Sequence, residues 1–171
     1  STKRILDTSS DAKATALFDR FRKNNTWHVP TLVTLRSLWR SQGLAPEDLA
    51  DGAKIQQKQL DVVARMWRSG VKIMAGTDGP LPQAGPALHD ELALLVKAGL
   101  SPMEALQAAT RNPAEFMGRV REVGTIEPGK LGDFAVLDAD PLSCAAERLR
   151  TLQAELTVVG GRVSFDRSQD R

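Results

Sequence analysis

Apolar residues recur at two different spacings along the chain, one typical of helices and one of short strands. The first helical pattern begins after Ser10-Asp11, which can cap a helix, and should end at Asn24-Asn25. Its apolar face is formed by Ala14, Leu17, Phe18 and Phe21. Residues 26–33 then indicate a short strand that Pro30 breaks, because proline cannot donate a hydrogen bond to a regular ladder.

Two further helices are predicted over residues 32–41 and 46–69, and Gly70 ends the second of them. A short apolar run over residues 71–78 predicts a buried strand. The segment 79–86 contains three prolines and two glycines, so it should form an irregular loop.

Three more helices are predicted after this loop, over residues 88–98, 102–111 and 112–118. The second begins with Ser101 and Glu104 in the spacing of a capping box, with proline at the first helical position. From about Val123 the spacing of apolar residues changes from one typical of helices to one typical of strands. Pro128-Gly129 predicts a type II turn, and the chain continues with a strand at 134–137 and a hairpin of 156–159 with 162–165. The pattern therefore predicts an α/β region followed by a small region of β-strands.

The composition is that of an ordinary globular protein. The chain has 171 residues, of which 42% are hydrophobic and 26% charged, enough for one domain or slightly more. The net charge is only +2, with no basic patch of the kind that binds nucleic acid. No apolar run approaches membrane-spanning length, and residues 1–7 lack the apolar core of a signal peptide. We therefore expect neither nucleic acid nor a membrane as partner, and a cytoplasmic location is favoured.

Residues that commonly bind metals are scarce. The two histidines, His28 and His89, are not paired at a spacing typical of metal ligands. Cys144 is the only cysteine, which excludes a Cys-x-x-Cys zinc site and an internal disulfide. We expect Cys144 to be a small, partly buried residue, since no base lies near it in sequence.

Asp78 is the most informative residue, because it ends the apolar run and precedes the Gly-Pro-rich loop. A buried strand that carries a charged side chain at its carboxyl end is how an α/β barrel builds an active site. A carboxylate there can bind a cation or take a proton from water. The alternative is that Asp78 only begins an Asp-Gly turn.

Several motifs of the chain occur in one order that identifies a family. They are Gly76-Thr77-Asp78, Leu88-His89-Asp90-Glu91-Leu92, Ala98-Gly99-Leu100-Ser101, Glu104-Ala105-Leu106, Ala108-Ala109-Thr110-Arg111-Asn112-Pro113-Ala114, and residues 124–134 from Gly124-Thr125-Ile126 to Phe134. Together they resemble the C-terminal part of an amidohydrolase-superfamily enzyme, in its imidazolonepropionase-like and prolidase-like branch of metal-dependent hydrolases. Val29-Pro30-Thr31-Leu32 is similar to the seventh-strand region of that branch, so the resemblance covers essentially the whole chain.

This resemblance implies a fold and a role for Asp78. Residues 1–122 would form the last two strands, with their helices, of a (β/α)8 barrel, and residues 123–171 the C-terminal strands of a small β-sandwich. Asp78 would be the eighth-strand carboxylate that binds a catalytic divalent metal, zinc in the complete enzyme, and takes a proton from the attacking water. The family's His-x-His, its mid-barrel lysine or glutamate and its two later histidines have no counterpart here. We therefore expect less than half of such an enzyme, with no catalytic metal bound to the isolated chain.

Other candidate site residues lie near Asp78 in sequence. Thr77 is expected to orient the turn or to hydrogen-bond near Asp78. His89 and Glu91, two apart at an expected helix start, could contact substrate, although a solvated first turn is the interpretation we favour. Thr77 and His89 are thus the candidate substrate-binding residues. His28 is expected to be a packed, hydrogen-bonded histidine, because it matches no ligand position of the family.

Two classes of function remain open. The first is a segment of a metal-dependent hydrolase that cleaves amide, peptide-like or cyclic-amide C–N bonds of small substrates, inactive as an isolated chain. The second is a non-catalytic remnant that acts as a self-associating structural domain. In either case the sheet edges and apolar faces of an incomplete barrel predict a homo-oligomer.

Overall fold

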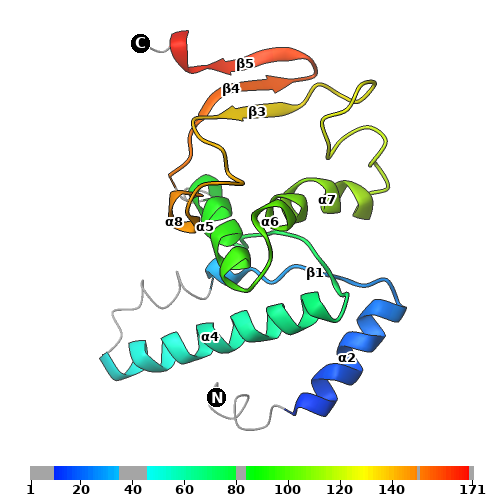
Figure 1. Ribbon diagram of the computed structural model, residues 1–171, viewed down its shortest axis with the longest axis vertical. Coiled ribbons are helices and arrows are strands. Elements are labelled where there is room, and N and C mark those ends of the chain that lie inside the picture. Colours follow the sequence, from blue (N-terminus) through cyan, green and yellow to red (C-terminus); the bar gives the residue numbers. More distant parts are fainter. Residues whose placement is uncertain (1–9, 35–45, 80–83, 150, 170–171) are drawn as a thin grey trace.

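The computed structural model of the chain describes residues 10–34, 46–79, 84–149 and 151–169 (Figure 1). Within these ranges the chain is a mixed α/β protein, as the sequence predicts, with a two-stranded parallel sheet and a three-stranded antiparallel sheet. The elements are, in order, α2 (Asp11–Lys23), β1 (Trp27–His28), α4 (Pro46–Arg68), β2 (Lys72–Ile73), α5 (Ala84–Lys97), α6 (Pro102–Ala109), α7 (Arg111–Phe116), β3 (Phe134–Leu137), α8 (Ala146–Leu149), β4 (Ala154–Val159), β5 (Arg162–Asp166) and the 3-10 turn η2 (Arg167–Gln169).

The first two strands are shorter than predicted. β1 is confined to Trp27 and His28, because Pro30 follows and Thr31 has a φ of 48°, which no regular strand residue adopts. β2 is likewise confined to Lys72 and Ile73, and the rest of the segment to Asp78 is irregular. The predicted helix 32–41 is helical at residues 32–34, and its remainder lies outside the described residues.

The core lies where α4, α5 and the two-stranded sheet meet. Its largest fully buried apolar side chains are Leu32, Val71, Ile73 and Leu95, each at most 1% exposed. α4 extends over almost the whole predicted range, and its buried residues Leu60, Val63 and Met66 recur at helical spacing. The same core therefore supports both β1 and β2.

α5 begins at Ala84, four residues before the predicted start at Leu88. Pro86 is compatible with this start because it lies in the first turn, where a backbone N–H has no helical partner. The predicted irregular loop 79–86 is therefore wrong at its end, and residues 80–83 lie outside the described part of the chain.

The capping box before α6 is confirmed, since the Ser101 hydroxyl accepts from the Glu104 amide and the Glu104 carboxylate accepts from the Ser101 amide. α6 ends at Ala109, two residues earlier than predicted, because Thr110 leaves helical geometry with φ −127° and ψ −77°. α7 follows immediately.

The second sheet has the order β3-β4-β5 and lies at the opposite end of the molecule from α2 and α4 (Figure 1). Gly160 and Gly161, with φ of 57° and 75°, form the predicted primed turn between β4 and β5. The type II turn at Pro128-Gly129 is also confirmed, because Gly129 has a φ of 87° and the Lys130 amide donates to the Glu127 carbonyl. The single-turn helix α8 has no counterpart in the sequence prediction.

Apolar side chains remain exposed on the outer strands of this sheet. They are Phe134 and Val136 on β3 and Val163 and Phe165 on β5, all more than a third exposed. Among the described residues, none of the helices is both long enough and apolar enough to cross a membrane.

Candidate active site

The carboxyl ends of β1 and β2 lie together, because the two strands are parallel and paired in register as Trp27 with Lys72 and His28 with Ile73. The Met74 amide continues this pairing by donating to the His28 carbonyl at 2.9 Å. Residues that follow the two strands are thereby brought to one edge of the sheet, where an α/β barrel places its active site.

The segment after β2 is also held from its other side. The Asn112 side-chain amide donates to the Ile73 carbonyl at 2.8 Å, and the Ala75 amide donates to the Ala108 carbonyl at 2.8 Å. Both partners lie at the junction of α6 and α7. The backbone of residues 73–75 is therefore fixed between β1 and this junction.

Gly76 lies against Val29, the residue after β1, at a distance that only glycine permits. A Cβ atom on Gly76 would lie 2.5 Å from Cγ1 of Val29, well inside van der Waals contact. The side chain of Val29 is branched at Cβ and short, so it has little freedom to withdraw. This close approach brings the end of β2 directly beside the segment that follows β1.

Thr77 and Asp78 complete the segment. The Thr34 hydroxyl donates to the Thr77 carbonyl, which joins the turn after β1 to the end of β2. Asp78 has a φ of 43°, in the left-handed region that aspartate tolerates better than most residues. Its side chain is exposed, whereas Thr77 is half-buried. The structure thus presents the Asp78 carboxylate to solvent at the carboxyl end of β2.

Glu91 is fully buried, with 0% of its surface exposed, and it does not lie in a solvated first turn of α5 as expected from sequence. The physical reason is periodicity. Glu91 precedes Leu95 by four positions and Ala98 by seven, so it lies on the buried face of the helix. One carboxylate oxygen, Oε2, accepts from the Val33 amide at 2.9 Å. Burial raises the pKa of Glu91 to about 7, although hydrogen bonds from the backbone of Leu32 and Val33 oppose this shift.

The two histidines lie in different settings. His89 is half-buried in the second turn of α5, and no hydrogen bond or ion pair links it to Asp78 within the described residues. His28 is in β1, as predicted, and burial lowers the pKa of its ring. Its packing is confirmed, but the described residues give its ring no hydrogen-bond partner. Cys144 is a free, half-buried thiol, as expected.

A metal centre needs more ligands than this edge of the sheet provides. Across the described ranges, no group of three or more His, Cys, Asp or Glu side chains is arranged to hold a metal ion. Asp78 is a single exposed carboxylate, whereas a catalytic zinc takes three protein ligands. The residues described here therefore do not by themselves fit a catalytic metal.

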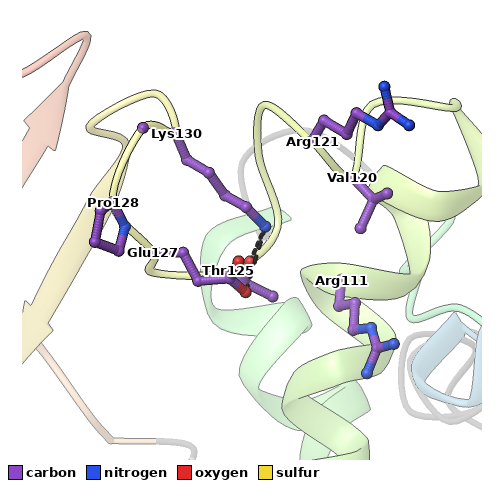
Figure 2. A pocket seen from close by; sticks show the side chains of 8 residues that line it. Arg111, Val120, Arg121, Thr125, Glu127, Pro128 and Lys130 are labelled. Atoms are coloured by element: carbon purple, nitrogen blue, oxygen red, sulfur yellow. Dashed lines mark hydrogen bonds and ion pairs between the residues drawn. The ribbon is translucent and has the colours of Figure 1, made fainter.

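A separate cavity of about 550 Å³ lies at the type II turn, lined in part by Arg111, Arg121 and Lys130. Figure 2 shows the Lys130 side chain reaching Thr125 and Glu127, while the guanidinium groups of Arg111 and Arg121 point away from it. The Lys130 side chain is only 11% exposed and forms an ion pair with Glu127 at 3.5 Å. The positive charges do not converge, so this cavity does not resemble an anion-binding site.

Comparison with known proteins gives one consistent family. The model of the amidohydrolase family matches residues 8–164. The chain is 34% identical over 127 residues to an N-substituted formamide deformylase of Arthrobacter pascens, covering 68% of the chain and 23% of that enzyme. It is 32% identical over 113 residues to an imidazolonepropionase of Aromatoleum aromaticum, covering 64% of the chain and 27% of that enzyme.

A solved structure of a Xaa-Pro dipeptidase with bound methionine in its active site is similar in fold. Its TM-score is 0.69 at 25% identity, covering 85% of this chain and 36% of the dipeptidase. The chain thus spans about a quarter of the length of the two curated relatives.

Proposed function

The chain belongs to the amidohydrolase family, and on that premise we propose that it is the C-terminal part of an enzyme that hydrolyses an amide-type C–N bond. Residues 1–122 contribute the last two strands of a (β/α)8 barrel with their helices, and residues 123–171 contribute strands of a small β-sandwich. The parallel pair β1–β2 and the separate antiparallel sheet support this division.

One observation carries the proposal: Asp78 is exposed five residues beyond the carboxyl end of β2, in a segment held by hydrogen bonds on both sides. In the complete enzyme Asp78 takes a proton from the water that attacks the carbonyl carbon of the substrate. It then gives that proton to the leaving nitrogen as the C–N bond breaks, which yields a carboxylic acid and an amine. Thr77 and His89 are proposed to contact the substrate from β2 and α5.

The substrate class is a small amide. One relative is named for N-substituted formamides, and the solved structure is of an enzyme named for Xaa-Pro dipeptides. Both names describe an acyl group on nitrogen. We therefore favour an N-substituted amide, peptide-like or cyclic, over an ester.

A divalent metal, zinc by our proposal, would polarise the carbonyl in the complete enzyme. Since the described residues contain no group of three or more candidate ligand side chains, we propose that Asp78 would share the metal with ligands from the rest of the complete enzyme. The isolated chain is accordingly proposed to be inactive.

The exposed apolar residues of β3 and β5 support a further proposal, that the isolated chain forms a homo-oligomer. Self-association alone was the other function open from the sequence. Membership in an enzyme family weighs against it as the sole role.

The test uses the full-length protein that carries this chain. It is purified with its bound metal and incubated with an N-alkyl formamide, an acyl-proline dipeptide, a cyclic imide and, as a control, the ester that corresponds to the formamide. Release of amine from at least one amide, abolished by a metal chelator and restored by zinc, is the expected result. Hydrolysis of the ester alone, or of none of the compounds, would overturn the proposal.

A further inference from the structure

Glu91 forms a connection between α5 and the turn that follows β1. Its Oε2 atom accepts from the Val33 amide at 2.9 Å, across 58 positions of sequence. The side chain has no exposed surface, and it lies in a helix whose neighbouring core residues are Leu92, Leu94 and Leu95. Burial of a carboxylate is unfavourable in itself, and its hydrogen bond from the Val33 amide offsets part of that cost.

The turn held by Glu91 is the one that reaches the candidate active site. Thr34 follows Val33 directly, and its hydroxyl donates to the carbonyl of Thr77. Thr77 immediately precedes Asp78. A continuous series of contacts therefore runs from the buried carboxylate through residues 33 and 34 to the residue that sets the direction of the Asp78 backbone.

Beyond Ala75, whose amide donates to the Ala108 carbonyl, few hydrogen bonds among the described residues fix this geometry. β1 and β2 are paired over only two residues each, and the pairing ends at Met74, four positions before Asp78. Asp78 itself has a left-handed backbone that must be held by its surroundings. The position of its carboxylate thus depends on the turn after β1.

We propose that Glu91 is a positioning residue for Asp78: it fixes the turn at Leu32–Thr34, and through Thr34 it fixes the backbone of Thr77 and the direction of the Asp78 carboxylate. The inference rests on the proposed role of Asp78 as the group that moves the proton. It adds to that site Glu91, a buried residue that lies in α5 rather than in the segment after β2.

Four variants of the full-length protein test the proposal. Glu91→Leu removes the acceptor but keeps a side chain of similar size. Glu91→Gln keeps an oxygen that can accept from Val33. Thr34→Val replaces the hydroxyl that donates to the Thr77 carbonyl with a methyl group. Leu95→Ala is the matched control, because Leu95 is also 0% exposed on α5 and its truncation lowers stability without removing a hydrogen-bond acceptor of the turn.

We expect the substitutions to change kcat much more than KM. Misplacing a catalytic group by about 1 Å can cost on the order of 100-fold in rate, so Glu91→Leu and Thr34→Val should lower kcat by roughly 10- to 100-fold, with KM within about threefold. Glu91→Gln should keep most of the wild-type kcat. Leu95→Ala should keep kcat within about threefold despite its loss of stability. Equal losses of kcat in Leu95→Ala and Glu91→Leu, or near-full kcat in both Glu91→Leu and Thr34→Val, would overturn the proposal.

A second measurement does not depend on catalysis. The backbone amide NMR signals of Thr77, Asp78 and Gly79 should shift in Glu91→Leu and Thr34→Val and stay in place in Leu95→Ala. Unchanged signals would overturn the inference even where amide hydrolysis is found. Shifted signals in a protein that hydrolyses no amide would support the connection and overturn the proposed function instead.

Discussion

Gly76 and Val29 approach each other so closely that a single added carbon on Gly76 would lie 2.5 Å from the Val29 Cγ1 atom. The two residues follow β2 and β1 respectively, just beyond the last paired positions. Glycine at this position is therefore a requirement of the strand geometry, and it determines how near the end of β2 lies to the turn after β1.

The first prediction is that Gly76→Ala destabilises the protein by about 1–3 kcal/mol, the usual cost of overpacking a tight contact. Adding Val29→Ala to this variant removes the opposing Cγ1 atom and should recover most of the lost free energy of unfolding. The free energies of unfolding of the two single variants and the double variant, from chemical denaturation, give the coupling between the sites. Additive losses would show that the clash does not involve Val29.

The second prediction concerns Asp78 in the full-length protein. Asp78→Asn keeps the size of the side chain but cannot accept a proton at neutral pH. Loss of a general base costs about 10²–10⁴-fold in kcat. The rate of amide hydrolysis is to be measured together with metal content.

Asp61→Asn is the matched control, because Asp61 is an exposed carboxylate on α4 far along the chain from Asp78. Near-full turnover of Asp78→Asn at equal metal content would show that another group moves the proton.

The third prediction follows from the raised pKa of Glu91, about 7 against an ordinary 4.5. The folded state binds the proton more tightly than the unfolded state, so stability must fall as pH rises from about 4.5 to about 7 and then level off. The full effect of such a shift is about 3 kcal/mol. In Glu91→Gln this fall should be absent.

His28 acts in the opposite direction in part of that range. Burial lowers the pKa of its ring, so its contribution to stability rises as pH approaches the ordinary value of 6.5 from below. The difference between wild type and Glu91→Gln, measured by denaturation at each pH, removes the contribution of His28 because both proteins carry it. A difference that is constant between pH 4.5 and 8 would contradict the raised pKa of Glu91.

The fourth prediction concerns metal. The isolated chain, freed of adventitious ions and then equilibrated with zinc, should hold well under one zinc per chain by elemental analysis, because its described residues form no ligand cluster. One tightly held zinc per chain, lost in Asp78→Asn, would contradict this prediction.

The fifth prediction is that the isolated chain sediments as an oligomer at micromolar concentration. Val136→Lys together with Val163→Lys should shift it toward monomer, since both apolar side chains are exposed on the outer strands of the second sheet. A matched pair of lysines on α4, at Gln57 and Asp61, should leave the assembly unchanged. A wild-type chain that sediments as a monomer would contradict the prediction.

Local signals in the sequence predicted local structure well. The capping box at Ser101, the glycine pair at 160–161 and the Pro128-Gly129 turn each depend on neighbouring residues alone, and all three are confirmed. The family was also predicted, because its motifs follow one another along the chain. The role of Asp78 in catalysis stays a prediction.

What the sequence did not reveal depends on contacts between distant residues. Pro30 is a local signal for the end of β1, but the left-handed backbone of Thr31 and the bonds from the segment after β2 to α6 and α7 are contained in no local pattern. The sequence pattern places the start of α5 at Leu88, four residues too late, and therefore predicts a solvated first turn for Glu91. Its spacing from Leu95 and Ala98 was the available signal, and it indicated burial.

The hydrogen bonds from Asn112 to Ile73 and from Ala75 to Ala108 occupy the edge of β2 that faces away from β1. Alternate residues of a strand direct their backbone groups to opposite edges, so these two bonds take up positions where a further strand would otherwise pair. The junction of α6 and α7 thus closes this edge beyond Ile73 and leaves it open to a neighbouring barrel strand only on the side that precedes the Ile73 carbonyl. In the isolated chain little of this edge stays open at β2, whereas the outer strands β3 and β5 are four and five residues long, so edge-to-edge association is expected at the second sheet.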